Sequence, residues 1–190
     1  GFLWHRGHRM IDAIILSHPD ADHYNAVPDL LEKMPVGQVL ASHQFFASDS
    51  PEIQRLLTAL QKQQIPATIL QHGDSLRLAE LHVDFLQGQL DSAELADNES
   101  SLAAVLRCRG QSILLPGDLE GSGLQQLLSR LPACSLLVSP HHGSPAANPP
   151  ELARQVRQLP GGRQALLRPG QTGLLVRKLR LQGALLVRLQ

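Results

Sequence analysis

The first 70 residues alternate between short apolar runs and segments whose apolar positions recur with helical spacing. Short runs rich in Ile, Val and Leu predict strands. They cover residues 11–16, where a buried strand is expected, and residues 36–41 and 67–70. Helices are expected between them, from a cap at Asn25 to Lys33 and from Pro51 to Gln63. The resulting β-α-β-α-β order favours a parallel or mixed sheet covered by helices.

The pattern changes after residue 80. Residues 81–86 alternate like a half-exposed strand, and residues 87–100 are polar and acidic like a surface loop. The apolar runs 102–107 and 112–115 flank a short turn and predict a hairpin. Further downstream, the pattern predicts a helix, a strand, a second helix and a closing pair of strands, over residues 122–130, 135–138, 150–158 and 173–189.

Charge is distributed unevenly along the 190 residues, although the formal net charge is zero. Residues 1–150 carry nine Lys and Arg against 16 Asp and Glu, whereas residues 151–190 carry eight against one. An acidic body can concentrate metal ligands, and a basic tail fits either a polyanion such as nucleic acid or an ordinary solvated face. The sequence contains no run approaching the ~18 apolar residues of a membrane helix and no recognisable signal peptide. Localisation is therefore left unknown.

The densest group of chemically active side chains directly follows the first predicted strand. The segment SHPDADH, residues 17–23, supplies two imidazoles and two carboxylates from His18, Asp20, Asp22 and His23. Folds of the α/β class usually place their chemistry at the carboxyl ends of strands. Imidazole nitrogens and carboxylate oxygens this close together indicate a site for one or two divalent cations.

Two later loops offer ligands of the same kind. Asp118 follows the second hairpin strand, and the pair His141-His142 follows the strand at 135–138. Three loops at three strand ends are a usual way to assemble a dinuclear site. The isolated histidines His43, His72 and His82 are expected to be ordinary surface or core residues.

These three motifs, in this order, resemble the metallo-β-lactamase superfamily. They are SHPDADH at 17–23, LLPGDLE at 114–120 and SPHHGS at 139–144. Asp20 stands where the superfamily's HxHxDH motif has its middle His. Together with the Asn-x-x-Ser stretch that begins at Asn98, this resembles the ComEC-like branch, named for a DNA-internalisation competence protein. The resemblance covers about residues 3–150 and implies an α/β (α+β, four-layer) αββα sandwich.

The resemblance also implies a role for each matching residue. His18 and Asp20 would hold one cation, Asp22 and His23 would hold or lie beside a second, and Asp118 would bridge the two. Asp22 could instead act as the base that orients the attacking water, so Asp22 and Asp118 are the expected catalytic residues. One residue of the pair 141/142 would complete the second cation site. His141 is slightly favoured over His142 because it follows the strand more closely, and Asn98 is the nearest candidate for a further ligand.

The expected cofactors are two divalent cations, Mn or Zn, with Mg also suitable. The carboxylate of Asp20 in place of an imidazole makes that position a harder ligand, which shifts the preference from Zn²⁺ toward Mn²⁺ or Mg²⁺. The implied activity is phosphodiester hydrolysis by a nuclease that acts on single-stranded DNA during competence-type DNA uptake. The alternatives are a non-catalytic remnant that binds metal weakly and a hydrolase of another substrate, since fold alone does not determine function.

The chain departs from the family pattern at both ends. The family opens with a strand pair before the metal motif, but only about ten residues precede the first predicted strand here. The later Asn…His-Pro segment of the ComEC-like branch is also missing, because no His occurs after residue 142. Residues 1–190 are therefore expected to form a single domain that is N-terminally truncated or trimmed. If the chain is a fragment of a larger ComEC-like protein, a membrane-embedded channel domain is an expected partner.

Overall fold

A computed structural model describes residues 2–78, 80–88, 98–155, 166–167 and 184–187. The chain divides into two compact units, each considered by itself below. Unit 1 comprises residues 1–70 and 174–190, and unit 2 comprises residues 71–173. The expectation of one domain over residues 1–190 stays a prediction.

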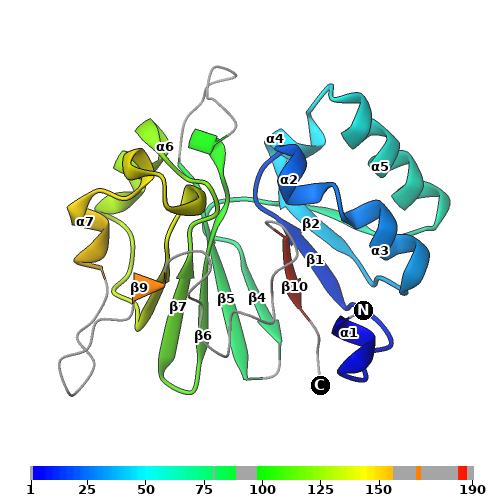
Figure 1. Cartoon of the computed structure of the whole chain (residues 1–190), viewed down its shortest axis with the longest axis horizontal. Helices are drawn as coiled ribbons and strands as arrows, with labels where there is room; N and C mark the ends of the chain where they lie inside the picture. Colours follow the sequence, from blue (N-terminus) through cyan, green and yellow to red (C-terminus); the bar gives the residue numbers. More distant parts are fainter. Residues whose placement is uncertain (1, 79, 89–97, 156–165, 168–183, 188–190) are drawn as a thin grey trace. The chain divides into compact units, whose positions relative to one another are not determined.

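The sheet of unit 1 has the strand order β10-β1-β2-β3, of which β10, β1 and β2 are labelled in Figure 1. Its strands are β1 (Ala13–Leu16), β2 (Val39–Ser42), β3 (Ala67–Leu70) and β10 (Ala184–Val187). β1, β2 and β3 run parallel, while β10 is antiparallel to β1. The mixed sheet predicted from the β-α-β-α-β order is therefore confirmed. β1 and β2 are buried along their whole length, as their continuous apolar sequence requires.

The described residues of unit 1 form five helices: α1 (Phe2–His5), α2 (Ala21–Tyr24), α3 (Val27–Lys33), α4 (His43–Phe46) and α5 (Pro51–Lys62). α5 buries Ile53, Leu56 and Leu60 on one face, because their spacing of three to four residues places them on the same side of a helix. They pack in a core that also contains Ile14 and Phe45.

The predicted cap at Asn25 is wrong. Asn25 ends α2, and α3 begins at Val27 after Ala26, with proline in its first turn. The segment 21–24 forms a helical turn before α3, where the sequence pattern predicted only a loop. The ligand candidates Asp22 and His23 therefore lie on a short helix.

Unit 2 contains a six-stranded sheet of order β4-β5-β6-β7-β8-β9. Its strands are β4 (Ser75–Leu78), β5 (Leu81–Leu86), β6 (Ala103–Cys108), β7 (Gln111–Leu115), β8 (Leu136–Val138) and β9 (Leu166–Leu167). β4 to β7 are antiparallel, whereas β7, β8 and β9 are parallel. The predicted hairpin is confirmed, and its turn is shorter than expected. Cys108 pairs with Gln111, and Arg109 and Gly110 both have positive φ, as a tight two-residue turn requires.

The helices of unit 2 are α6 (Gly121–Leu128) and α7 (Pro150–Ala153), with single 3₁₀ turns η1 (Asn98–Ser100), η2 (His141–Gly143) and η3 (Pro145–Ala147). The core packs Leu124 and Leu127 of α6 with Leu114 and Leu137 of the sheet. Three predictions lie partly outside the described residues. They are the loop at 87–100, the helix at 150–158 and most of the closing strand pair at 173–189. Among the described residues, no helix has the length and apolar character needed to cross a bilayer.

Candidate metal centre

In unit 1, the ligand-rich segment begins where β1 ends. Leu16 is the last residue of the buried strand, and His18 is fully buried two positions later. α2 then begins at Ala21, and its single turn brings His23 back into the interior, so that only 2% of His23 is exposed. The end of a buried strand and one helical turn are thus sufficient to bury both imidazoles of the motif.

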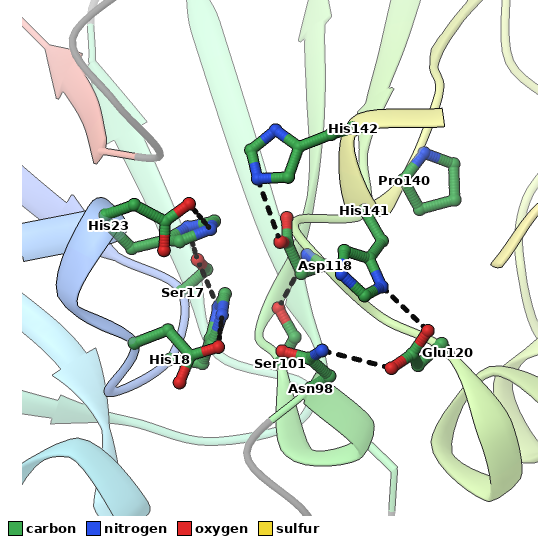
Figure 2. A network of polar contacts seen from close by, with 12 residues as sticks. Ser17, His18, His23, Asn98, Ser101, Asp118, Glu120, Pro140, His141 and His142 are labelled. Carbon is green, nitrogen blue, oxygen red and sulfur yellow. Dashed lines mark hydrogen bonds and ion pairs between the residues drawn. The ribbon is translucent and has the colours of Figure 1, made fainter. Parts of the chain in front are cut away.

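Ser17 joins the two imidazoles (Figure 2). Its hydroxyl Oγ lies 3.0 Å from Nδ1 of His18 and 3.1 Å from Nδ1 of His23. The two ring centroids are 3.9 Å apart, with an angle of 54° between the planes. Since Ser17 is itself buried, this three-residue cluster is largely protected from competing water.

The carboxylates of the motif lie against the other nitrogens of the two rings. Nε2 of His18 is 3.4 Å from Oδ2 of Asp20, and Nε2 of His23 is 3.7 Å from Oδ2 of Asp22. The Asp20 and Asp22 side chains are 42% and 54% exposed. Each pair therefore combines a buried nitrogen with an oxygen that solvent can reach, which is a donor combination suited to Zn²⁺ or Mn²⁺.

In unit 2, the corresponding donors surround Asp118. Its side chain is largely buried, and its backbone N–H donates to Oγ of Ser101, 3.2 Å away. Nε2 of His142 lies 3.3 Å from Oδ2 of Asp118, and the imidazole is mostly exposed. Figure 2 shows this carboxylate between Ser101 and His142. The Asn-x-x-Ser stretch thus contributes a hydroxyl that holds the Asp118 backbone.

The loop carrying His141 and His142 has an unusual backbone. Both residues have positive φ, 43° and 51°, and the His141 N–H donates to the carbonyl oxygen of Gly117 at 3.2 Å. Left-handed conformations cost a non-glycine residue roughly 1–2 kcal/mol each. Such strain is characteristic of functional loops, and here it directs the two neighbouring imidazoles to different carboxylates.

Glu120 is a site residue that the sequence analysis missed. Its Oε2 lies 2.7 Å from Nδ1 of His141, and its Oε1 accepts a hydrogen bond of 3.0 Å from Nδ2 of Asn98. The hydrogen bond from Asn98, and then the contact with His141, lower the pKa of Glu120 despite the opposing effect of burial. Glu120 is therefore an ionised acceptor, and Nδ1 of His141 donates to it. In a neutral imidazole, a proton on Nδ1 leaves Nε2 as the acceptor atom of the ring. The sequence feature that could have identified Glu120 as a site residue is its position inside the LLPGDLE motif.

Asn98 supplies a further candidate ligand. While its Nδ2 donates to Glu120, its Oδ1 is buried and accepts no hydrogen bond from any residue within the described ranges. A buried amide oxygen left in this state costs about 1–3 kcal/mol, and amide oxygens are ligands of hard cations. The donor chemistry of both units therefore fits divalent cations.

Within each unit, the structure brings each predicted imidazole against one carboxylate. It pairs His18 with Asp20 and His23 with Asp22 in unit 1. In unit 2, it pairs His142 with Asp118, and His141 with Glu120. The preference for His141 over His142 as the ligand stays a prediction, although His142 is the imidazole that contacts Asp118.

Comparison with known proteins gives matches of two kinds. The family model described as "Metallo-beta-lactamase superfamily" matches residues 2–188. ComE operon protein 3 of Bacillus subtilis (strain 168) is 28% identical over 158 residues, which are 82% of this chain and 20% of that protein. The chain thus spans about a fifth of the length of this curated relative.

Solved structures are similar to this chain at low sequence identity. A protein of Parabacteroides distasonis ATCC 8503, named for a proposed metal-dependent hydrolase activity, has a TM-score of 0.51 and 14% identity, with 92% of this chain and 74% of that chain covered. Zn²⁺-bound PqqB from Methylobacterium extorquens has a TM-score of 0.45 and 15% identity, with 67% of this chain and 44% of that chain covered.

Proposed function

Because this chain belongs to the metallo-beta-lactamase superfamily, a family of metal-dependent hydrolases, we propose that it hydrolyses phosphodiester bonds in DNA. One observation carries the proposal: each unit pairs imidazoles with carboxylates close to the end of a strand. In unit 1 the pairs are His18–Asp20 and His23–Asp22. In unit 2 the corresponding pair is His142–Asp118.

The proposed ligands of two divalent cations are the seven residues predicted from the motifs. They are His18, Asp20, Asp22, His23, Asp118, His141 and His142. Asn98 is an additional candidate, because its buried Oδ1 accepts no hydrogen bond from the described part of the chain. When bound, two such cations activate water for attack near neutral pH and stabilise charge on the phosphoryl oxygens.

Asp22 and Asp118 are proposed to have different roles in the chemistry. The half-exposed Asp22 carboxylate is accessible to water, which suits a base that orients the attacking water and accepts its proton. The Asp118 carboxylate is nearly buried, and Ser101 fixes the Asp118 backbone. A carboxylate restrained in this way is better suited to being a ligand shared by two cations than to accepting and releasing protons.

The choice of DNA as substrate is supported by the sequence motifs and by charge. Asp20 and the Asn98–Ser101 stretch resemble the ComEC-like branch, and the ComE operon protein 3 of Bacillus subtilis matches 82% of the chain. Residues 151–190 carry eight basic residues and one acidic residue, a charge balance that favours a polyanion. We therefore propose single-stranded DNA in competence-type uptake as the substrate, and a membrane-embedded channel domain as a partner.

Metal analysis and DNA cleavage test the proposal together. The purified chain is stripped with a chelator, reloaded with Mn²⁺, Zn²⁺ or Mg²⁺, and incubated with labelled single-stranded DNA. Asp118→Ala removes the proposed shared ligand. Asp29→Ala is the matched control, because that carboxylate is 76% exposed and forms a surface ion pair with Lys33. We expect metal-dependent cleavage that Asp118→Ala abolishes and Asp29→Ala leaves unchanged.

Other outcomes identify the alternatives. Cleavage that survives Asp118→Ala would refute the assigned site and indicate a contaminating nuclease. Metal uptake without cleavage of DNA, but with hydrolysis of a small phosphodiester or of an ester, would favour a hydrolase of another substrate. Absence of metal uptake by the unmodified chain would favour a non-catalytic remnant of the fold.

A further inference from the structure

Ser17 lies at the centre of the unit 1 cluster, although it is not itself one of the proposed ligands. We propose that Ser17 is a positioning residue that sets the tautomer of His18 and His23 simultaneously, so that both rings present a bare Nε2 to a cation. The inference rests on the proposed metal site and adds a residue that controls it. It is carried by the contacts from one hydroxyl to both Nδ1 atoms, at 3.0 and 3.1 Å.

The hydrogen-bonding capacity of a hydroxyl limits how Ser17 can bind the two rings. Ser17 has one O–H donor and two acceptor lone pairs. A neutral imidazole carries a single proton, on either Nδ1 or Nε2. If Ser17 donates to Nδ1 of one ring, that ring must carry its proton on Nε2. Its Nε2 then has no lone pair in the ring plane and cannot bind a metal.

The consequence is the opposite when Ser17 accepts hydrogen bonds instead of donating one to a ring. If Oγ accepts hydrogen bonds from both Nδ1–H groups, both Nε2 atoms keep their lone pairs. Of the two arrangements, only this one is compatible with His18 and His23 acting as ligands through Nε2. Ligating histidines generally donate their other N–H to a neighbouring acceptor, which fixes ring orientation and tautomer. Here a single hydroxyl performs this role for two rings.

The surroundings of Ser17 strengthen the argument. Ser17 is 8% exposed and both imidazoles are buried, so bulk water has little access to replace the hydroxyl as a partner of Nδ1. The opposite nitrogen of each ring lies 3.4 or 3.7 Å from a carboxylate oxygen. These are separations at which one cation could be bound by both atoms, given metal–ligand bonds of about 2.1 Å. In each ring, Nε2 therefore lies beside the carboxylate of the paired aspartate, and Nδ1 lies beside the Ser17 hydroxyl.

The test combines spectroscopy with metal affinity in the full chain. Nitrogen-15 NMR of the histidine side chains distinguishes a protonated ring nitrogen from a bare one and identifies which nitrogen binds Zn²⁺. Zn²⁺ affinity is measured by competition with a chelating dye. The variants are Ser17→Ala, the hydroxyl-retaining Ser17→Thr and its isosteric partner Ser17→Val. The matched control is Ser135→Ala, which removes a half-buried hydroxyl that accepts from the Ser112 N–H at 3.1 Å.

We expect Nδ1–H signals from both rings and Nε2 coordination in the Zn²⁺-loaded chain. Ser17→Ala and Ser17→Val should weaken Zn²⁺ binding by about 10- to 100-fold and convert one or both metal-free rings to the Nε2–H tautomer. Ser17→Thr should restore most of the affinity, and Ser135→Ala should change neither measurement. The comparison of Thr with Val holds the side-chain volume nearly constant and isolates the hydroxyl.

The outcomes separate this inference from the proposed function. If the unmodified chain binds Zn²⁺ through Nδ1 of either ring, or if Ser17→Val binds as tightly as Ser17→Thr with unchanged tautomers, the role of Ser17 is refuted while the metal site stands. If the unmodified chain binds no metal, the proposed function fails. The spectra of the metal-free chain then still show whether Ser17 holds both rings in the Nδ1–H tautomer. Should Ser17→Ala not fold, the spectra of the unmodified chain provide the same test without a variant.

Discussion

Replacing Gly123 with alanine would test how closely the η1 turn is held against α6. Gly123 is buried in the first turn of α6. A Cβ added there would overlap the carbonyl oxygen of Glu99, with the Glu99 carbonyl carbon at 2.8 Å and Leu119 Cδ1 at 3.1 Å. Because the overlapping atoms belong to the backbone, no side-chain rotation relieves the contact. Either η1 or α6 must move by roughly 1 Å, since protein interiors leave little free volume.

Two opposing effects determine how much Gly123→Ala changes the free energy of unfolding. Alanine is favoured over glycine in a helix interior by about 1 kcal/mol. Overpacking a well-packed site costs about 1–3 kcal/mol, and an overlap with main-chain atoms belongs at the upper end of this range. The net expectation for Gly123→Ala is a loss of roughly 2 kcal/mol in the free energy of unfolding. The same movement would displace Asn98 and Ser101, which hold Glu120 and the Asp118 backbone. Metal affinity should therefore fall as well, by about 10-fold.

Urea unfolding followed by circular dichroism measures the first effect, and dye competition for Zn²⁺ measures the second. Gly88→Ala is the matched control. A Cβ at Gly88 would meet its nearest atom, Oε1 of Gln126, at 3.4 Å, which is ordinary van der Waals contact. Gly88→Ala should therefore change stability and affinity little. If Gly123→Ala is as stable as the unmodified chain, or if both variants lose stability equally, the proposed packing of η1 on α6 is wrong.

Three further substitutions test other parts of the structure. Glu120→Gln removes the charge that accepts from His141 and should weaken Zn²⁺ binding about 10-fold. Unchanged affinity in the same dye titration would contradict a role for Glu120. Phe85→Ala empties a fully buried position in unit 2 and should lower the free energy of unfolding by about 3–5 kcal/mol in urea; a loss below 1 kcal/mol would show that the site is not packed as described. Ser42→Ala removes the side-chain acceptor of the Phe45 N–H, 3.3 Å away, and should cost about 1 kcal/mol in the same experiment, as for other helix caps. Equal stability would show that this bond makes no net contribution.

Much of the strand framework could be predicted from local sequence. β3 and β5 have the predicted bounds, 67–70 and 81–86, and α5 differs from its prediction by one residue at its end. In α5 and β5 the apolar residues recur with the period of the element and form a buried face. β3 is mostly exposed, and it is held as a strand by its pairing with β2. β4 and α4 were missed, since each is short and neither has a continuous apolar run that local pattern could identify. Elements this short owe their conformation to a partner: β4 pairs with β5, and α4 depends on its cap at Ser42.

The identity of the candidate ligands was also available from the sequence. His18, Asp118 and His141 each follow closely on a strand, and local hydrophobic pattern is sufficient to place a strand end. The family and its α/β fold class follow from the same motifs and are confirmed by the match over residues 2–188. These features share a physical basis, because each depends on residues that are neighbours along the chain.

The tertiary structure decided which polar atoms meet. Glu120 pairs with Asn98 across 22 positions and with His141 across 21, and no local pattern specifies such hydrogen bonds. The left-handed turn at His141 and His142 sends the two rings to different carboxylates, although their positions in the sequence are nearly equivalent. Ser17 becomes a common partner of two rings only because α2 folds His23 back beside His18. The sequence thus determined which donors are present, and the fold determined the hydrogen bonds that orient them.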